Sequence, residues 1–355
     1  MIDWTASAQR SYEYYIVNPG TWMDEKRIDL VKTSSITRDS TAKTLGSASF
    51  TIDGNIGECY VRTYMITIQN GVRTREPLGT HLLQTFPSKF NGTMREIQVD
   101  AYTSLIELEE NPPPIGFYIK KGENIMDKAY EIVRENARAP VVKPNCPKTL
   151  PYDFAANADD TWLSYLIDLI ALAEYEFDLD ELGRILFAPF QDVDSIKPIW
   201  EYTDDNSSIL YPDISISNDM YKIPNVIEVI YSTDKEMYRA TAINDDPNSP
   251  VSTVARGRKI TYRDTSPSIS GTPDQSKIEE YAENLLKSMS TLSHTLSYSH
   301  GYCPVRVRDG VRLNYERSDL DAVNAKVLSQ TIDCTPECKV SETATFNSKL
   351  WGEEK

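Results

Sequence analysis

Short segments in which apolar and polar residues alternate dominate the first third of this sequence. In a strand, successive side chains point to opposite faces, so a period of two predicts strands with one buried face. This alternation is clearest in three segments, residues 48–53, 64–68 and 96–101. Asn-Gly dipeptides at 70–71 and 91–92 favour tight hairpins, because both residue types tolerate positive φ. Residues 28–110 are therefore predicted to form a β-sandwich or barrel.

A proline-rich stretch, ENPPPIG at 110–116, ends this region, because proline lacks the amide hydrogen that a strand ladder needs. Helical periodicity follows, and it predicts a helix that stops before Pro140 and a second helix with Asp159 or Asp160 as N-cap. The first helix would bury Ile125, Ala129, Ile132, Val133 and Ala137, and the second Trp162, Leu163, Leu166, Ile167 and Ile170. An α/β module is therefore predicted over 111–195.

The segment EYEFDLDELGRILFAPF, residues 174–190, places Asp178, Asp180 and Gly183 at the first, third and sixth positions of a calcium-loop spacing. Such a loop also needs an oxygen ligand at its fifth position and a bidentate Glu at its twelfth. Here these positions are Leu182 and Pro189. The segment instead predicts a β-hairpin, with Gly183 in the turn and a second strand, 185–189, that is apolar on both faces and covered on both.

From residue 196 onward the β pattern returns. Residues 225–243 predict two strands around a polar turn at 232–236, followed by a loop at 244–250. One helix interrupts, with Thr272 as N-cap, Pro273 at its first position and Gln275 completing a capping box. Its apolar stripe is Ile278, Tyr281, Ala282, Leu285 and Met289, and three further strands are expected within 295–302, 311–318 and 325–332, with a hairpin signal at Asp309-Gly310.

The composition describes a soluble globular chain of 355 residues that carries 53 acidic and 37 basic side chains, a net charge of −16. Nucleic-acid binding depends on Lys and Arg displacing counterions, so this chain is poorly suited to gripping DNA. The acids cluster at Glu174, Glu176, Asp178, Asp180 and Glu181, at Asp204 and Asp205, and at Asp245 and Asp246. Such clusters are either solvated surface or a surface that must not adhere to nearby DNA.

Neither a transmembrane run nor a signal peptide is expected from this sequence, which indicates synthesis and folding in a cytoplasm. Five cysteines fit free thiols in a reducing compartment better than a structural zinc site, which usually needs two close pairs. The cysteines are Cys59, Cys146, Cys303, Cys334 and Cys338.

Residues with catalytic potential are few. The three histidines are His81, His294 and His300, and no nucleophile-elbow or phosphate-loop motif is present. His294 and His300 would share one face of a strand, and we interpret them as ordinary polar residues. Cys303 lies three residues after His300, which on a strand would point the two to opposite faces. We therefore expect no catalytic, cofactor-binding or metal-binding residues.

Paired carboxylates leave one alternative open. An acidic, tyrosine-rich β protein could be a carbohydrate-active enzyme or a glycan-binding tail module, because two suitably spaced acids suffice for glycoside hydrolysis. The 21 tyrosines suit carbohydrate stacking and protein interfaces equally. A monomer that clears polysaccharide would favour this alternative.

The order of these regions resembles the hub proteins of bacteriophage tails, which include the central baseplate hub of contractile tails and the N-terminal part of tail-associated proteins of flexible tails. The resemblance covers about residues 45–320 and rests mainly on overall order. Three stretches carry it: the hairpin FDLDELGRILFAPF after DDTWLSYLIDLIALAEY, then IPNVIEVIYSTDKEMYRATAINDDPNSPVS, and then IEEYAENLLKSMSTLSHTLSYSHGYCPVRVRDGVRLNY.

The resemblance implies a mainly β α+β fold with two tube-like β-barrel domains, 1–110 and 196–345, an α/β insert at 111–195 and a C-terminal tail at 346–355. It also implies a homotrimeric ring in the virion that adapts a six-fold tail tube, or distal tail protein ring, to three-fold spike or fibre proteins of the tip. The tape-measure protein and DNA would pass through its lumen. No peptidoglycan-cleaving domain is recognised, so we expect no lytic role.

Overall fold

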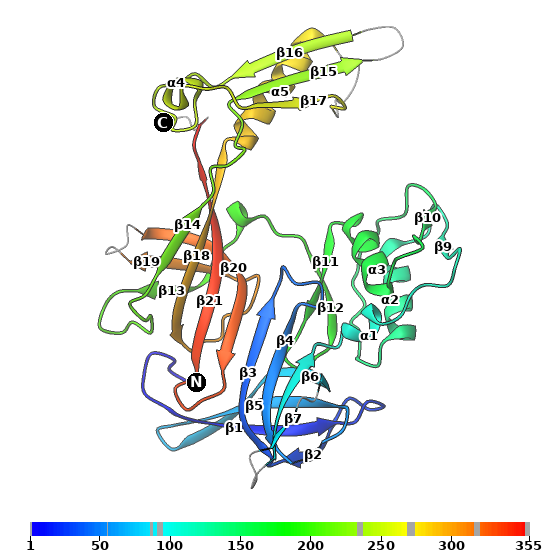
Figure 1. Cartoon of the computed structure of the whole chain (residues 1–355), viewed down its shortest axis with the longest axis vertical. Coiled ribbons are helices and arrows are strands. Elements are labelled where there is room, and N and C mark those ends of the chain that lie inside the picture. The colour runs from blue at the N-terminus through cyan, green and yellow to red at the C-terminus, as the bar shows by residue number, and fades with distance from the viewer. Residues whose placement is uncertain are drawn as a thin grey trace. The chain divides into compact units, whose positions relative to one another are not determined.

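The structure is a computed structural model that describes residues 2–54, 56–85, 88–90, 95–232, 237–267, 274–315 and 320–351. It is built mainly from β-strands, as predicted (Figure 1). The chain divides into two compact units, Met1–Ile214 with Ser297–Ala344, and Ser215–Leu296 with Thr345–Lys355. The sequence-order division at 110, 195 and 345 and the closure of each β region into a barrel stay predictions.

Most strands of the first unit belong to one large sheet, in the order β18, β21, β20, β3, β4, β8, β6, β5, β1, β2. Their bounds are β1 Gln9–Val17, β2 Asp24–Ile28, β3 Val31–Asp39, β4 Gly46–Asp53, β5 Cys59–Gln69, β6 Val72–Thr85, β8 Arg95–Tyr102, β18 Thr291–Gly301, β20 Leu320–Asp333 and β21 Lys339–Lys349. Three further strands attach to it, β7 Ser88–Phe90 to β8, β19 Gly310–Tyr315 to β20, and β13 Pro198–Thr203 to β19.

Burial along β4 and β8 follows the predicted period of two, but β5 is buried on both faces. The prediction of one buried face is wrong for β5, because Tyr60 enters one hydrophobic core while Val61 and Met65 enter another. The hairpin at 70–71 is confirmed, with φ of 51° at Asn70 and 78° at Gly71. The dipeptide at 91–92 lies outside the described residues.

The early and late β regions are joined edge to edge. β20 pairs antiparallel with β3, with Thr331 opposite Thr37. Ile332 and Val340 consequently share a hydrophobic core with Ile36.

Between these regions, α1 Ile106–Glu109, α2 Ile125–Asn136 and α3 Trp162–Ala171 pack together with β9 Tyr118–Ile119, β10 Phe154–Ala155, and the hairpin of β11 Tyr175–Leu179 and β12 Ile185–Pro189. Both predicted helices are confirmed. The N-cap of α3 is Thr161 and not Asp159 or Asp160, because Thr161 and Ser164 form a reciprocal capping box. A short 3₁₀ helix, η1 Val193–Ser195, follows.

The second unit contains a three-stranded sheet, β16–β15–β17, with α5 against one face (Figure 1). Its elements are β14 Ser215–Asn218, β15 Val226–Ser232, β16 Met237–Ile243, α4 Thr253–Arg256, β17 Thr261–Asp264 and α5 Gln275–Met289. The predicted strand pair and helix are confirmed. Asp274 caps α5 by accepting from the Lys277 amide, so the prediction of Thr272 as N-cap is wrong; Thr272 and Pro273 themselves lie outside the described residues.

Asp309-Gly310 does not form the predicted hairpin. Gly310 is instead the first residue of β19 and pairs with Pro198 of β13. A Cβ on Gly310 would lie 2.5 Å from the Lys197 carbonyl oxygen, so close strand approach explains the glycine. Within the described ranges, no helix is long and apolar enough to cross a membrane.

Candidate functional site

The β11–β12 hairpin carries the largest acidic cluster of the chain, and its geometry depends on one glycine. Gly183, in the turn, has a φ of 73°, and an added Cβ would lie 2.8 Å from the Thr80 Cβ. Both the positive φ and the close approach favour glycine. The predicted hairpin is confirmed. The prediction that both faces of its second strand are covered is wrong, because beyond Ile185 the side chains are partly or fully exposed.

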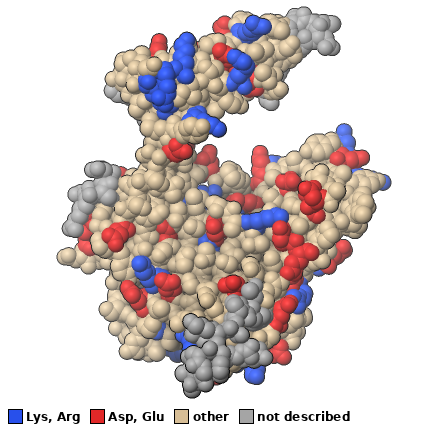
Figure 2. All heavy atoms as spheres, viewed as in Figure 1, with Lys and Arg blue, Asp and Glu red and all other residues tan. Residues whose placement is uncertain are grey.

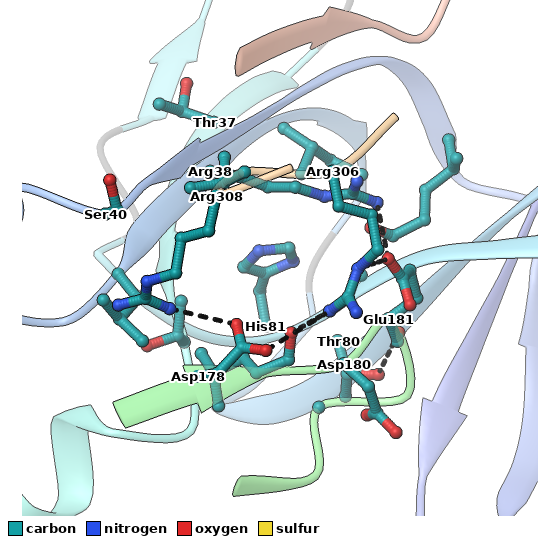
Figure 3. Close-up of a pocket in the computed structure, with 18 residues that line it drawn as sticks. Thr37, Arg38, Ser40, Thr80, His81, Asp178, Asp180, Glu181, Arg306 and Arg308 are labelled. Carbon is teal, nitrogen blue, oxygen red and sulfur yellow. Dashed lines mark hydrogen bonds and ion pairs between the residues drawn. The ribbon is translucent and has the colours of Figure 1, made fainter. Parts of the chain in front are cut away.

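Two arginines from the segment before β19 bind the hairpin's carboxylates (Figure 3). The Arg306 Nε lies 2.8 Å from a Glu181 carboxylate oxygen. The Arg308 Nε lies 2.8 Å from Glu176, and its Nη1 lies 3.1 Å from Asp178. Of these three contacts, the one from the Arg308 Nη1 to Asp178 is a charge-assisted hydrogen bond, a type about twice as strong as a neutral one, and the other two are ion pairs.

Arg38 and His81 lie across the same pocket (Figure 3). Arg38 donates to the Leu78 carbonyl oxygen at 2.7 Å and also lies 3.6 Å from the Glu181 carboxylate. His81 is 4% exposed, and its Nδ1 has no hydrogen-bond partner in the described part of the chain. Burial, and then the charge of Arg38, lowers the pKa of His81 to about 3. His81 is therefore neutral at ordinary pH.

The cavity enclosed by these side chains measures about 60 Å³. This is enough for a few water molecules, one of which can satisfy His81, whereas pockets for small-molecule ligands usually have a few hundred Å³ or more. The three arginines are matched by carboxylates on the hairpin. The arrangement therefore holds the hairpin in place and leaves little room for a substrate.

The interpretation of this acidic cluster as solvated surface holds for Glu174, which is exposed, but not for the four other carboxylates, which are partly buried and paired. Asp178 pairs with Arg308, Asp180 accepts from the Arg184 amide at 2.8 Å, and Glu174 pairs with Lys148. Throughout the described ranges, no group of three or more potential ligands could hold a metal ion. The absence of calcium binding at this segment stays a prediction.

Sequence reasoning missed the arginines that hold the hairpin, although a signal for them exists. Arg306 and Arg308 are spaced two apart, as are Glu176 and Asp178, and two strands or extended segments with this matched spacing can pair charge by charge. Arg62 was missed as well. It is 4% exposed and donates to the Leu182 carbonyl oxygen in the hairpin turn at 3.1 Å.

A second polar cluster surrounds His300, deep in the first unit. The prediction that Cys303 and His300 point to opposite faces is wrong, because β18 ends at Gly301 and the chain then bends. The Cys303 Sγ lies 3.9 Å from the His300 Nδ1. That nitrogen also lies 2.8 Å from the Gly301 carbonyl oxygen, which can only accept, so it carries a proton and donates.

The other His300 nitrogen, Nε2, lies 3.3 Å from a Glu342 carboxylate oxygen and 3.1 Å from the Tyr202 hydroxyl. Glu342 also accepts from the Gln330 amide at 2.6 Å and from the Tyr298 hydroxyl. Burial opposes charge on His300. Hydrogen bonds to Cys303 and Glu342 outweigh this effect and raise the pKa of His300 to about 10. The histidine is thus a buried cation paired with Glu342.

A cysteine beside a histidine and a carboxylate has the composition of a nucleophilic site. Cys303, His300 and Glu342 are, however, all 2% exposed or less. A nucleophile must contact its substrate, and this thiol contacts only the protein interior. The cluster therefore supplies buried hydrogen bonds and an ion pair to the interior of the first unit. His294 is separate from it, since its Nε2 lies 2.7 Å from the Ser348 hydroxyl and its ring stacks on Phe346.

The fold is similar to those of two solved tail proteins. A tail protein from Neisseria meningitidis superposes with a TM-score of 0.64 at 10% identity, covering 95% of this chain and 97% of that one. The 43 kDa tail protein of prophage MuSo2 from Shewanella oneidensis superposes with a TM-score of 0.61 at 10% identity, covering 94% of this chain and 98% of that one.

A structure of the Francisella PdpA–VgrG complex is also similar, with a TM-score of 0.55 and 7% identity over 97% of this chain and 53% of that chain. At these identities the likeness concerns the fold alone. No described protein family matches the sequence, and neither does any curated protein.

Proposed function

We propose that this chain is a structural hub protein of a bacteriophage tail. The observation that carries the proposal is the fold similarity to two tail proteins over nearly the full length of both partners. Similarity of fold supports a function only together with features of the chain itself. Here those features are a charged cavity that holds only a few waters and a Cys–His–Glu cluster sealed in the interior.

The hub would be a homotrimeric ring at the tail tip. With two β-rich regions per chain, three copies would present six similar units to a six-fold tail tube or distal tail ring. The same ring would present three-fold symmetry to a spike or fibre protein. Closed cyclic symmetry of this kind is the usual form of soluble homo-oligomers. The tape-measure protein and then the genome would pass through the centre, and the chain would act without catalysis or cofactor.

The charge of the first unit supports a lumen that lets DNA slide. Of the chain's charged side chains, 26 basic and 40 acidic ones belong to this unit, a net charge of −14. Lys and Arg contacts to phosphate release counterions and add affinity, whereas carboxylates repel phosphate. An acidic wall would therefore keep the genome from adhering during ejection.

The test is the copy number of the chain in a tail-tip complex isolated from the particle. Native mass spectrometry is expected to give three copies per complex, with the tail tube protein of the same sample in multiples of six as internal control. One copy or six copies per complex would contradict the ring.

A further inference from the structure

The second unit carries a concentration of cations on the loop before β15, at the end of α4 and on the loop that follows α4. They are Lys222, Arg256, Arg258 and Lys259, and we call them the basic surface. Lys222, Arg258 and Lys259 are exposed, and Arg256 is partly buried. Figure 2 shows Lys and Arg side chains gathered over the end of this unit that contains α4.

Internal hydrogen bonds fix these loops. The Arg256 guanidinium donates to the carbonyl oxygens of Met220 and Ile223 at 3.1 and 3.0 Å, which ties the first loop to α4. Asn225, fully buried, donates to the Arg258 carbonyl oxygen at 3.0 Å and accepts from the Ile260 amide at 2.7 Å. The backbone that displays the cations is therefore ordered by contacts within the unit.

Exposed apolar side chains lie on the same loop before β15 and on α4. Tyr221 is 74% exposed, Val254 61% and Met220 36%. The Lys222 Nζ lies 5.2 Å from the centroid of the Tyr221 ring. Arginine, tyrosine and methionine are among the residue types enriched in protein interfaces.

The cations of the basic surface have no ion-pair partner within the described part of the chain. The acid nearest in sequence, Asp219, accepts from the Tyr221 amide at 2.7 Å. Arg256 and Arg258 also repel each other. Burial, and then the charge of Arg258, lowers the pKa of Arg256. An acidic partner would relieve this repulsion.

The two units differ in charge, and this difference suggests the partner. The second unit has 11 basic and 13 acidic side chains, a net charge of −2, against −14 in the first unit. We infer that the basic surface of one copy docks on the acidic first unit of a neighbouring copy. The inference rests on the proposed ring, and it names the surface through which copies recognise one another.

Nucleic acid is the competing partner, and the observations favour protein. Four cations on a unit that is itself net acidic, within a chain of −16, give few counterion-releasing contacts. The exposed Val254 and Met220 suit an apolar protein contact, whereas binding of single strands relies on several stacking aromatic rings.

The test measures self-association of the full chain. Light scattering gives the mass of the assembly over a range of protein concentrations, at 50 and at 300 mM NaCl. The double variant Arg258→Glu/Lys259→Glu is expected to need about tenfold more protein for half-assembly, because reversed charges would face like charges. Wild-type assembly is expected to weaken at the higher salt. The control, Lys287→Glu/Lys349→Glu, changes the same charge at exposed sites of the same unit and is expected to assemble as wild type.

Equal assembly of both variants and wild type would overturn the inference and leave the ring intact. A wild-type chain that stays monomeric at every concentration would also overturn it. The proposed ring would then be tested separately, by the copy number of the chain in the isolated tail-tip complex. Duplex DNA of 30 base pairs serves as the second probe. Salt-sensitive DNA binding that the Arg258→Glu/Lys259→Glu variant loses, with assembly unchanged, would assign the surface to nucleic acid.

Discussion

His300 and Glu342 form an ion pair with no solvent contact at either side chain. A buried ion pair adds little stability compared with a well-packed apolar replacement. Removing one partner, however, leaves the other charge buried without a counter-charge. The substitution Glu342→Gln is therefore expected to lower the free energy of unfolding by about 3–5 kcal/mol. Urea unfolding followed by tryptophan fluorescence measures this. Glu283→Gln, at an exposed site on α5, is the control and should change stability by less than about 0.5 kcal/mol.

His81 predicts a dependence of stability on acid pH. Its folded pKa of about 3 lies below the unfolded value of 6.5, so the unfolded chain takes up the proton first. The contribution of neutral His81 is fully present above pH 6.5 and is lost as pH falls from 6.5 through 3. His81→Gln is expected to flatten this part of the stability–pH curve. A curve of unchanged slope, measured by urea unfolding between pH 7 and 4, would contradict the assignment.

His300 acts in the opposite direction. Its folded pKa of about 10 lies above the unfolded value of 6.5. Its contribution is therefore fully present below pH 6.5 and is lost as pH rises through 10. The sequence could show neither behaviour. The spacing of His300 and Cys303 suggested opposite faces, and only the end of β18 at Gly301 brings them together.

At the scale of elements, the contribution of single arginines to docking of the β11–β12 hairpin can be compared by substitution. Arg308→Ala removes the partner of Glu176 and Asp178 and is expected to destabilise hairpin docking by about 1–3 kcal/mol. Amide hydrogen exchange within 175–189 measures the effect, and it is expected to be faster in the variant. Arg184→Ala is the matched control, since this half-exposed side chain also pairs with a hairpin carboxylate. Its loss should cost less than about 1 kcal/mol, and equal effects would count against the docking role.

Periodicity predicted the elements well where one environment covers each face. The stripe of α2 and the alternation of β4 both appear as burial in the structure. Periodicity predicted burial less well on β5, whose two faces contact different hydrophobic cores. No local sequence pattern shows which part of the chain covers the second face. Helix starts shifted by one or two residues, since Asp160 and Thr161 are both good N-caps and the reciprocal capping box of Thr161 with Ser164 decided between them.

At the scale of the whole molecule, the charge distribution predicts weak interaction with DNA. The paired hairpin acids are already neutralised, so a repulsive wall must draw on the remaining carboxylates of the first unit. The assembled protein is expected to show no salt-sensitive binding of duplex DNA between 50 and 200 mM NaCl, measured by fluorescence anisotropy. A basic or neutral bore in a density map of the tail tip would contradict the acidic lumen.

The pairing of β20 with β3 joins residues made early to residues made late. Thr37 and Thr331 are 294 positions apart. Because ribosomes add about 5–20 residues per second, β20 is synthesised roughly 15–60 s after β3, and the edge of β3 stays unpaired for that time. Until then an unpaired strand edge is open to other chains. The first unit can close only after residues 320–333 leave the ribosome, so a nascent chain shorter than this cannot complete the sheet. Synthesis itself would thus delay assembly until each subunit carries its late strands.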